Sequence, residues 1–123
     1  MQTTTLFRPV GPAELALVAA SGWRRFPARL PTQPIFYPVC NATYAIEIAS
    51  EWNAVHDGGG FVLRFDVRTD HLSRYAKQVV GSRHHEEYWI PASELEAFND
   101  AIASGIELLH AFHARAPEAR LEA

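Results

Sequence analysis

Cysteine is nearly absent from this sequence: Cys40 is its single example among 123 residues. One thiol cannot close an intramolecular disulfide, so the fold must be stable without cross-links, as expected in a reducing cytoplasm. No sequence signal pairs Cys40 with a histidine. We therefore expect a small, buried apolar group at this position rather than a nucleophile.

Long apolar runs are also missing. The first ten residues, MQTTTLFRPV, lack the basic start and the apolar stretch of a signal peptide, and no segment approaches the roughly 18 apolar residues that span a bilayer. The sequence therefore predicts a cytoplasmic protein with no membrane partner.

The sequence has no excess of basic residues. It contains 11 Lys and Arg against 14 Asp and Glu, for a formal net charge of −3. Proteins that bind duplex nucleic acid normally carry a basic stripe, so bulk nucleic acid is disfavoured as a partner.

The remaining pattern predicts one α+β domain over residues 1–123, with tails at 1–4 and 114–123 frayed. Strands that follow one another late in the chain argue against a doubly wound parallel sheet. The periodicities predict strands at Thr3–Val10, Ile35–Tyr37, Phe61–Val67, Tyr75–Val80, Glu87–Ile90 and Ile106–Phe112, and helices at Pro12–Ala20, after Asn41, at Asp70–Ser73 and from Ser93. The last of these strands has a helix as its alternative, because Ile106, Leu109 and His113 also fit helical spacing.

Local signals set several of these boundaries. Asn41 is a predicted N-cap, and Ser93 with Glu96 has the spacing of a capping box. Four prolines between Trp23 and Pro38 exclude a long helix there and indicate an extended loop, which is either a binding loop or a plain surface connection. Gly58–Gly60 follows a helix and precedes a strand, so it is a turn rather than a phosphate loop.

The densest polar cluster is RHHEE, residues 83–87. In an extended segment alternate side chains share a face, which places His85, Glu87 and Trp89 together and Glu86 on the other side. One carboxylate can then project into a cleft beside an aromatic ring. The alternative is a solvated hairpin end with no function.

A metal site is not expected from this cluster. Adjacent histidines on a strand point to opposite faces, so further ligands would have to come from His56, His71, His110 or His113, and the sequence has no HExxH motif. Arg8 lies between apolar neighbours in the first strand, where it is exposed, paired, or used to hold an anion such as pyrophosphate.

Four segments carry a resemblance to a known group: LFRPVGPAEL, RFPARLPTQPIFYPV, NATYAIEIASEWN and HHEEYWIPASELEAFN. They resemble a group of small bacterial proteins with ADP-ribosylation or crystallin-type names. The layout is similar to that of compact ADP-ribosyltransferase-like domains, which implies a split antiparallel or mixed sheet with about three helices.

The resemblance implies a set of site residues. Arg8 matches the cationic residue that holds the phosphates of NAD, which is the substrate. Tyr37 or Tyr44 matches the aromatic position that stacks on nicotinamide, and His85 and Trp89 lie beside it. Glu87 matches the acid that stabilises the oxocarbenium-like centre, with Glu86 as the alternative if the register differs by one residue.

Two classes of function follow from this reading. The first is transfer of ADP-ribose from NAD, or hydrolysis of NAD, with a possible protein acceptor. The second is a non-catalytic nucleotide-binding or protein-interaction module, such as a partner in a toxin–antitoxin pair or a defence locus. The second class is motivated by the acidic balance and the many aromatic residues, which could form a protein interface. Two departures from the family pattern leave open binding of a nucleotide without turnover: a Ser-Thr-Ser segment is missing, and Pro38 stands where the second strand would continue. A purely structural domain is a third reading.

Overall fold

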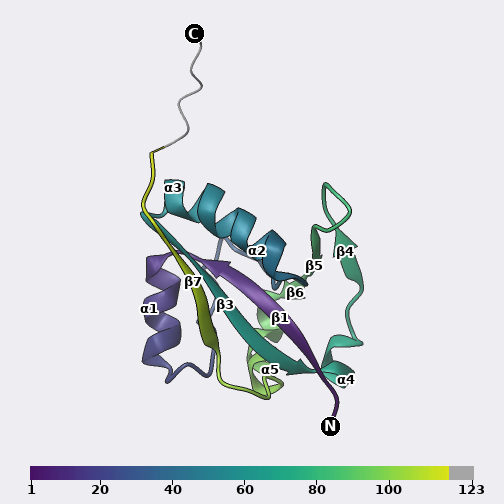
Figure 1. The fold of residues 1–123 in the computed structure, drawn as a ribbon. Helices are drawn as coiled ribbons and strands as arrows, with labels where there is room; N and C mark the ends of the chain where they lie inside the picture. The colour runs from purple at the N-terminus through teal and green to yellow at the C-terminus, as the bar shows by residue number, and fades with distance from the viewer. Residues whose placement is uncertain (117–123) are drawn as a thin grey trace.

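A three-stranded antiparallel sheet forms the centre of the protein (Figure 1). The computed structural model describes residues 1–116. The sheet contains β1 (Thr3–Val10), β3 (Gly59–Arg68) and β7 (Glu107–His113), in the order β1-β3-β7. Helices pack on both faces of these strands, so the predicted α+β class is confirmed.

The middle strand, β3, has two faces of different character, as its alternating sequence predicts. Leu63, Phe65 and Val67 are buried in the larger apolar cluster, while Val62 belongs to a smaller cluster on the opposite face. Successive side chains of a strand point to opposite faces, so these residues divide the core into two layers.

Shorter strands form two further antiparallel pairs outside the central sheet. They are β2 (Ile35–Phe36), β4 (Lys77–Val79), β5 (Glu86–Tyr88) and β6 (Ile90–Pro91), with β2 paired to β6 and β4 paired to β5. Val39 bridges Phe7 of β1 and Glu87 of β5. The β4–β5 hairpin is thereby attached to the edge of the central sheet.

The helical elements follow local sequence signals. α1 (Pro12–Ala20) begins with Pro12, and Gly22, at φ +77°, follows it. Asn41 caps α2 (Ala42–Ile48) by accepting a 2.8 Å hydrogen bond from the Tyr44 N–H, which confirms the predicted N-cap. The same helix continues through a π-helical turn, η1 (Ala49–Asn53), into α3 (Ala54–His56). The others are α4 (Thr69–Leu72), the 3₁₀ turn η2 (Ala92–Glu94) and α5 (Leu95–Asp100).

The two apolar layers are covered by different helices. Val18 of α1, Leu95 and Phe98 of α5 and Phe26 of the proline-rich loop pack on one face. Ala45 and Ala49 of the α2–α3 helix pack on the other, together with Val39 and Val62.

Three boundary predictions need correction. Ser93 makes no capping hydrogen bond, and Glu96 pairs instead with Arg25 at 3.0 Å, so the predicted capping box is wrong. Thr3 and Thr4 are paired with β3, so they are not a frayed end. In the predicted C-terminal tail, the Arg115 N–H donates to the Ala54 carbonyl at 3.0 Å, and residues 117–123 lie outside the described part of the chain.

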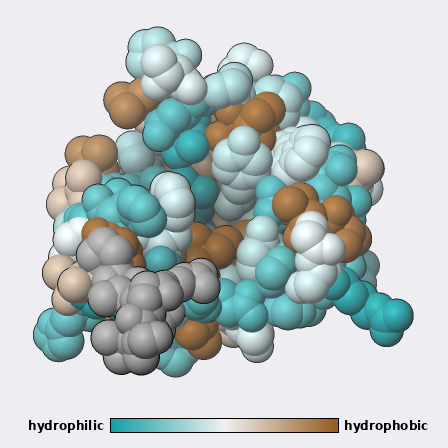
Figure 2. All heavy atoms as spheres, turned by 90° about the horizontal axis from the view of Figure 1, so that it is seen from above, coloured by the Kyte–Doolittle hydropathy of each residue, from teal (hydrophilic) through white to brown (hydrophobic). Residues whose placement is uncertain are grey.

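The surface seen from above carries separate apolar patches among hydrophilic residues, rather than one continuous apolar face (Figure 2). Such scattered apolar residues are normal for a monomeric surface. Within residues 1–116, none of the helices combines the length and apolar character needed to cross a membrane.

Candidate functional site

A cavity of about 550 Å³ opens beyond the end of β1, between the start of α1 and the second half of the α2–α3 helix. Its charged and polar residues come from segments far apart in sequence. The lining residues are Arg8, Pro9, Val10, Gly11, Pro12, Ala13, Glu14, Arg29, Leu30, Gln33, Trp52, Asn53 and Asp57.

Arg8 is buried at one side of this cavity and is held by a bidentate ion pair. Its Nε and Nη2 donate to the two carboxylate oxygens of Glu14 at 2.8 and 2.9 Å, and Nη1 donates to the Tyr37 carbonyl at 3.2 Å. The guanidinium lies 4.5 Å from the ring centre of Phe36. Arg8 is therefore fixed in one orientation, because two parallel hydrogen bonds hold its planar guanidinium against the planar carboxylate.

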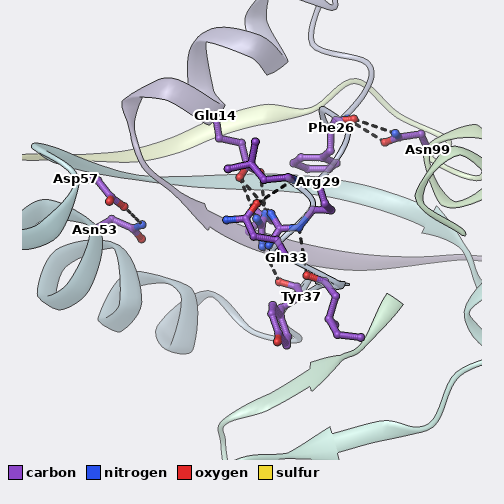
Figure 3. Close-up of polar contacts among 11 residues, drawn as sticks. Glu14, Phe26, Arg29, Gln33, Tyr37, Asn53, Asp57 and Asn99 are labelled. Atoms are coloured by element: carbon purple, nitrogen blue, oxygen red, sulfur yellow. Dashed lines mark hydrogen bonds and ion pairs between the residues drawn. The ribbon is translucent and has the colours of Figure 1, made fainter. Parts of the chain in front are cut away.

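Arg29 brings a second positive charge to the same carboxylate. Its Nη1 lies 3.9 Å from Glu14 Oε1, and its Nε donates to the Ile35 carbonyl at 3.1 Å. Figure 3 shows Glu14, Arg29 and Gln33 gathered together. Two guanidinium groups around one carboxylate leave this end of the cavity with a local excess of one positive charge.

The charge on Arg29 is incompletely compensated. Burial lowers the pKa of its guanidinium, and the neighbouring charge of Arg8 lowers it further, while Glu14 acts in the opposite direction. A bound anion would favour the charged form. The positive end of the α1 dipole already faces two carboxylates, because Glu14 lies in the first turn and Asp57 lies against the N-cap residue Gly11.

The other end of the cavity contains an unsatisfied acceptor. Asn53 is 8% exposed; its Nδ2 donates to Asp57 Oδ2 at 2.8 Å, and its Oδ1 is buried without a partner. The Asp57 carboxylate fixes the orientation of the amide, since a flip would bring two oxygens together. Figure 3 shows the pair set apart from Arg29. A buried acceptor without a partner is costly, so this end of the cavity is the less completely satisfied one.

Trp52 supplies a flat aromatic surface to the lining of the cavity. Its side chain is 57% exposed although it is large and apolar, and its ring is stacked on His56 with the ring centres 3.8 Å apart. A half-exposed indole beside polar groups is suited to contact with a ligand ring.

The residues predicted around Glu87 do come together, but elsewhere. Glu87 is 7% exposed and accepts 2.7 Å hydrogen bonds from the Tyr44 hydroxyl and from Trp89 Nε1. His85 stacks on Tyr44 with ring centres 4.4 Å apart. Burial, followed by the hydrogen bond to Glu87, raises the pKa of Tyr44, so its hydroxyl stays a donor to the carboxylate.

The structure does not bring Arg8 and Glu87 into one cleft. Phe7 pairs with Val39 and Val39 pairs with Glu87, so these three side chains share the face covered by α2. Arg8 follows Phe7 and points to the opposite face, against Phe36. The chain's own sheet lies between the predicted cation and the predicted acid, and Glu87 does not line the cavity.

The two remaining predicted residues have other roles. Glu86 is in register with Val79 and lies 4.0 Å from the Lys77 ammonium. Tyr37 contributes its backbone carbonyl to Arg8, while its side chain is exposed.

Comparison of the chain with protein-family models, curated proteins and solved structures found no match. The candidate site therefore rests on geometry and chemistry alone. The sequence-based set included Arg8 but missed Glu14, Arg29, Gln33, Asn53 and Asp57. The signal that could have found two of them was the proline-rich loop, since Arg29 and Gln33 lie within it.

Cys40 is not part of the cavity and is held as a thiol. It packs against the larger apolar cluster, and burial raises its pKa to about 11.

We expect native Cys40 to react slowly with a thiol reagent. Two pKa units above the ordinary value of 9.0 correspond to roughly 100-fold less thiolate near pH 8, and the native rate should rise until the pH reaches about 11. The measurement is the alkylation rate of native and urea-unfolded protein against pH. Equal rates at pH 8 in the two states would show that the thiol is accessible and ordinary.

Proposed function

We propose that this protein is a nucleotide-binding module whose cavity binds NAD or a related dinucleotide. The observation that carries the proposal is the polar layout of the cavity. It has a cationic end at Arg8 and Arg29, and the hydrogen-bonded Asn53–Asp57 pair and the exposed Trp52 line its other part. Those two ends fit the phosphates and the ribose or carboxamide groups of a dinucleotide.

The charges support a phosphate at the Arg29 end. Arg8 is already neutralised by Glu14 through two hydrogen bonds, whereas Arg29 approaches Glu14 only at 3.9 Å. An incoming phosphate would therefore compete for Arg29 and leave the Arg8–Glu14 pair intact.

The geometry supports recognition more directly than transfer of ADP-ribose. A transfer reaction requires a carboxylate near the reacting ribose. The carboxylates that line the cavity are Glu14 and Asp57, which are bonded to Arg8 and Asn53 respectively, and Glu87 lies on the other face of the sheet. The proposed function is accordingly the non-catalytic binding role rather than the enzyme.

The test uses Arg29→Gln, because Arg29 is the guanidinium less closely paired with Glu14. Arg29 also donates to the Ile35 carbonyl, so thermal unfolding of the ligand-free variant is measured beside the wild type. NAD and ADP-ribose should raise the melting temperature of the wild-type protein in a concentration-dependent way, since a ligand that binds only the native state stabilises it. Loss of the contact to phosphate should weaken binding by roughly tenfold or more in the variant. Isothermal titration calorimetry gives the two dissociation constants.

Arg24→Gln is the matched control, because Arg24 is exposed, outside the cavity, and its replacement removes the same charge. It should bind as the wild type does. If millimolar NAD and ADP-ribose leave the melting temperature of the wild type unchanged, the proposal is wrong. If both variants bind NAD equally weakly, the loss of affinity comes from the change in net charge and not from a contact at Arg29.

A further inference from the structure

A second polar cluster, made of Glu47, His84 and His85, lies between α2 and the β4–β5 hairpin, outside the cavity. The Glu47 carboxylate of α2 accepts from two imidazoles at once: its Oε1 lies 3.0 Å from His84 Nε2, and its Oε2 lies 2.8 Å from His85 Nε2. One donor atom from each of the three side chains lies within 4.8 Å of the others.

The two histidines converge because residues 81–85 form a turn rather than a strand. Gly81 has a φ of +82°, which favours glycine, and the His85 N–H donates to the Ser82 carbonyl at 3.0 Å. Alternation of faces applies only to extended backbone. The sequence-based expectation that His84 and His85 point apart is therefore wrong.

We propose that Glu47, His84 and His85 bind one divalent late first-row transition metal ion, with Zn²⁺ as the reference ion. Two imidazoles and one carboxylate are ligands that zinc accepts, with bonds of about 2.0–2.2 Å, and tetrahedral bonds of that length place ligand atoms roughly 3.3 Å apart. The two Nε2 atoms lie 3.0 and 2.8 Å from different oxygens of the Glu47 carboxylate, so both imidazoles already face it, and side-chain rotation would bring one oxygen and both nitrogens around the ion. Three protein ligands leave a fourth position for water.

The surrounding contacts hold the ligands in place before any ion arrives. The Asn41 Nδ2 donates to the His84 carbonyl at 2.7 Å, and the His85 ring is stacked on Tyr44. When His84 Nε2 coordinates the ion it gives up the proton that it shares with Glu47, and Nδ1 can then carry a proton and donate it to Ser82 Oγ, 3.3 Å away. A contact from the Ser82 N–H to His85 Nδ1, at 3.5 Å, would be given up, and a hydrogen bond of that length is weak.

An ion can reach the cluster from solvent. The side chains of Glu47, His84 and His85 are 37%, 48% and 27% exposed. Hard ions such as Mg²⁺ and Ca²⁺ prefer sites made of oxygen atoms, so they are poor competitors here. The bound ion would tie the hairpin to α2 and stabilise the attachment of β4 and β5 to the sheet.

The test uses full-length protein without a histidine tag, freed of metal by a chelator. Calorimetric titration with Zn²⁺ should give one site with a dissociation constant below about 10 µM. Titration with Co²⁺ should give visible absorption typical of a low-coordinate site. His84→Ala and Glu47→Gln should each weaken Zn²⁺ binding by tenfold or more. His110→Ala, which removes an exposed histidine from β7, should leave it unchanged.

Several outcomes would overturn the proposal. The first is that the wild type shows no saturable Zn²⁺ binding up to 100 µM, about ten times the expected dissociation constant. The second is that the wild type and both ligand variants bind Zn²⁺ with the same affinity. Thermal unfolding of each metal-free variant is measured beside the wild type. A variant that melts within a few degrees of the wild type and still binds Zn²⁺ normally counts against the site, and Glu47→Gln serves this purpose if His84→Ala does not fold.

Discussion

Gly60→Ala is expected to destabilise the protein by roughly 3 kcal/mol or more, and to lower its melting temperature by roughly 10 °C or more. Gly60 lies at the start of β3, where the central sheet meets the α2–α3 helix. A Cβ atom at this position would overlap the carbonyl oxygen of Ala49 and lie 2.7 Å from its carbonyl carbon. Both are backbone atoms, so the contact cannot be relieved by turning a side chain.

The close approach arises from small residues on both sides. Ala45 and Ala49 are fully buried, which lets the helix backbone sit directly on the strand. Ala49 also begins the π-helical turn that carries Trp52 and Asn53 to the cavity. A displacement there would move two lining residues, so nucleotide binding should weaken along with stability.

Gly59→Ala is the matched control for this substitution. The neighbouring glycine has no atom nearer than 3.5 Å to a Cβ atom, so its replacement should change the free energy of unfolding by less than about 1 kcal/mol. Urea unfolding followed by circular dichroism gives both values. Equal values for the two variants would show that the helix can move away from Gly60 at little cost.

The elements set by local chemistry could be predicted from the sequence. The alternation in Phe61–Val67 defined β3 and its two faces, and the Asn41 side chain defined the start of α2. Both depend on residues close together in the chain. The prediction failed at Ser93, where Glu96 pairs with a distant arginine instead of the helix start.

The candidate site could be predicted only in part, because it depends on contacts between distant segments. The face on which Arg8 lies relative to Glu87 is fixed by the register of Phe7, Val39 and Glu87. A shift of one residue in either pairing would reverse it. No local pattern specifies that register, so a sequence comparison could place both residues in one site although the sheet separates them.

The cavity residues also could not be predicted from local sequence patterns. Arg29 comes from the proline-rich loop and Asn53 from a helix, and neither has a pattern of its own. What identifies Asn53 is the absence of a partner for its buried Oδ1, which only the packed structure reveals.

Arg8→Met is expected to destabilise the protein by roughly 2–3 kcal/mol, because it leaves the largely buried Glu14 carboxylate without its bidentate partner. This loss of unfolding free energy is at the lower end of the values seen when a buried ion pair loses one partner, because Arg29 remains 3.9 Å from Glu14. The Tyr37 carbonyl also loses a donor. Chemical denaturation of the variant gives the value.

A double-mutant cycle separates the pair from its surroundings. Glu14→Gln alone leaves Arg8 buried without a full counter-charge, whereas Arg8→Met combined with Glu14→Gln removes both charges. The double variant should be more stable than the sum of the single effects predicts, with a coupling of about 1.5 kcal/mol or more. Additive effects would contradict the assignment of Arg8 as a residue held by Glu14.

The cycle also determines how Arg8 can be used to test ligand binding. If Arg8 holds the β1–α1 junction together, Arg8→Met will lower nucleotide affinity through altered packing as well as lost charge, whereas Arg29→Gln will act mainly through the lost contact. The two variants are therefore expected to differ in unfolding free energy by more than about 1 kcal/mol while both bind NAD weakly. Wild-type affinity for NAD in Arg29→Gln would place the phosphates away from Arg29 and contradict the proposed site.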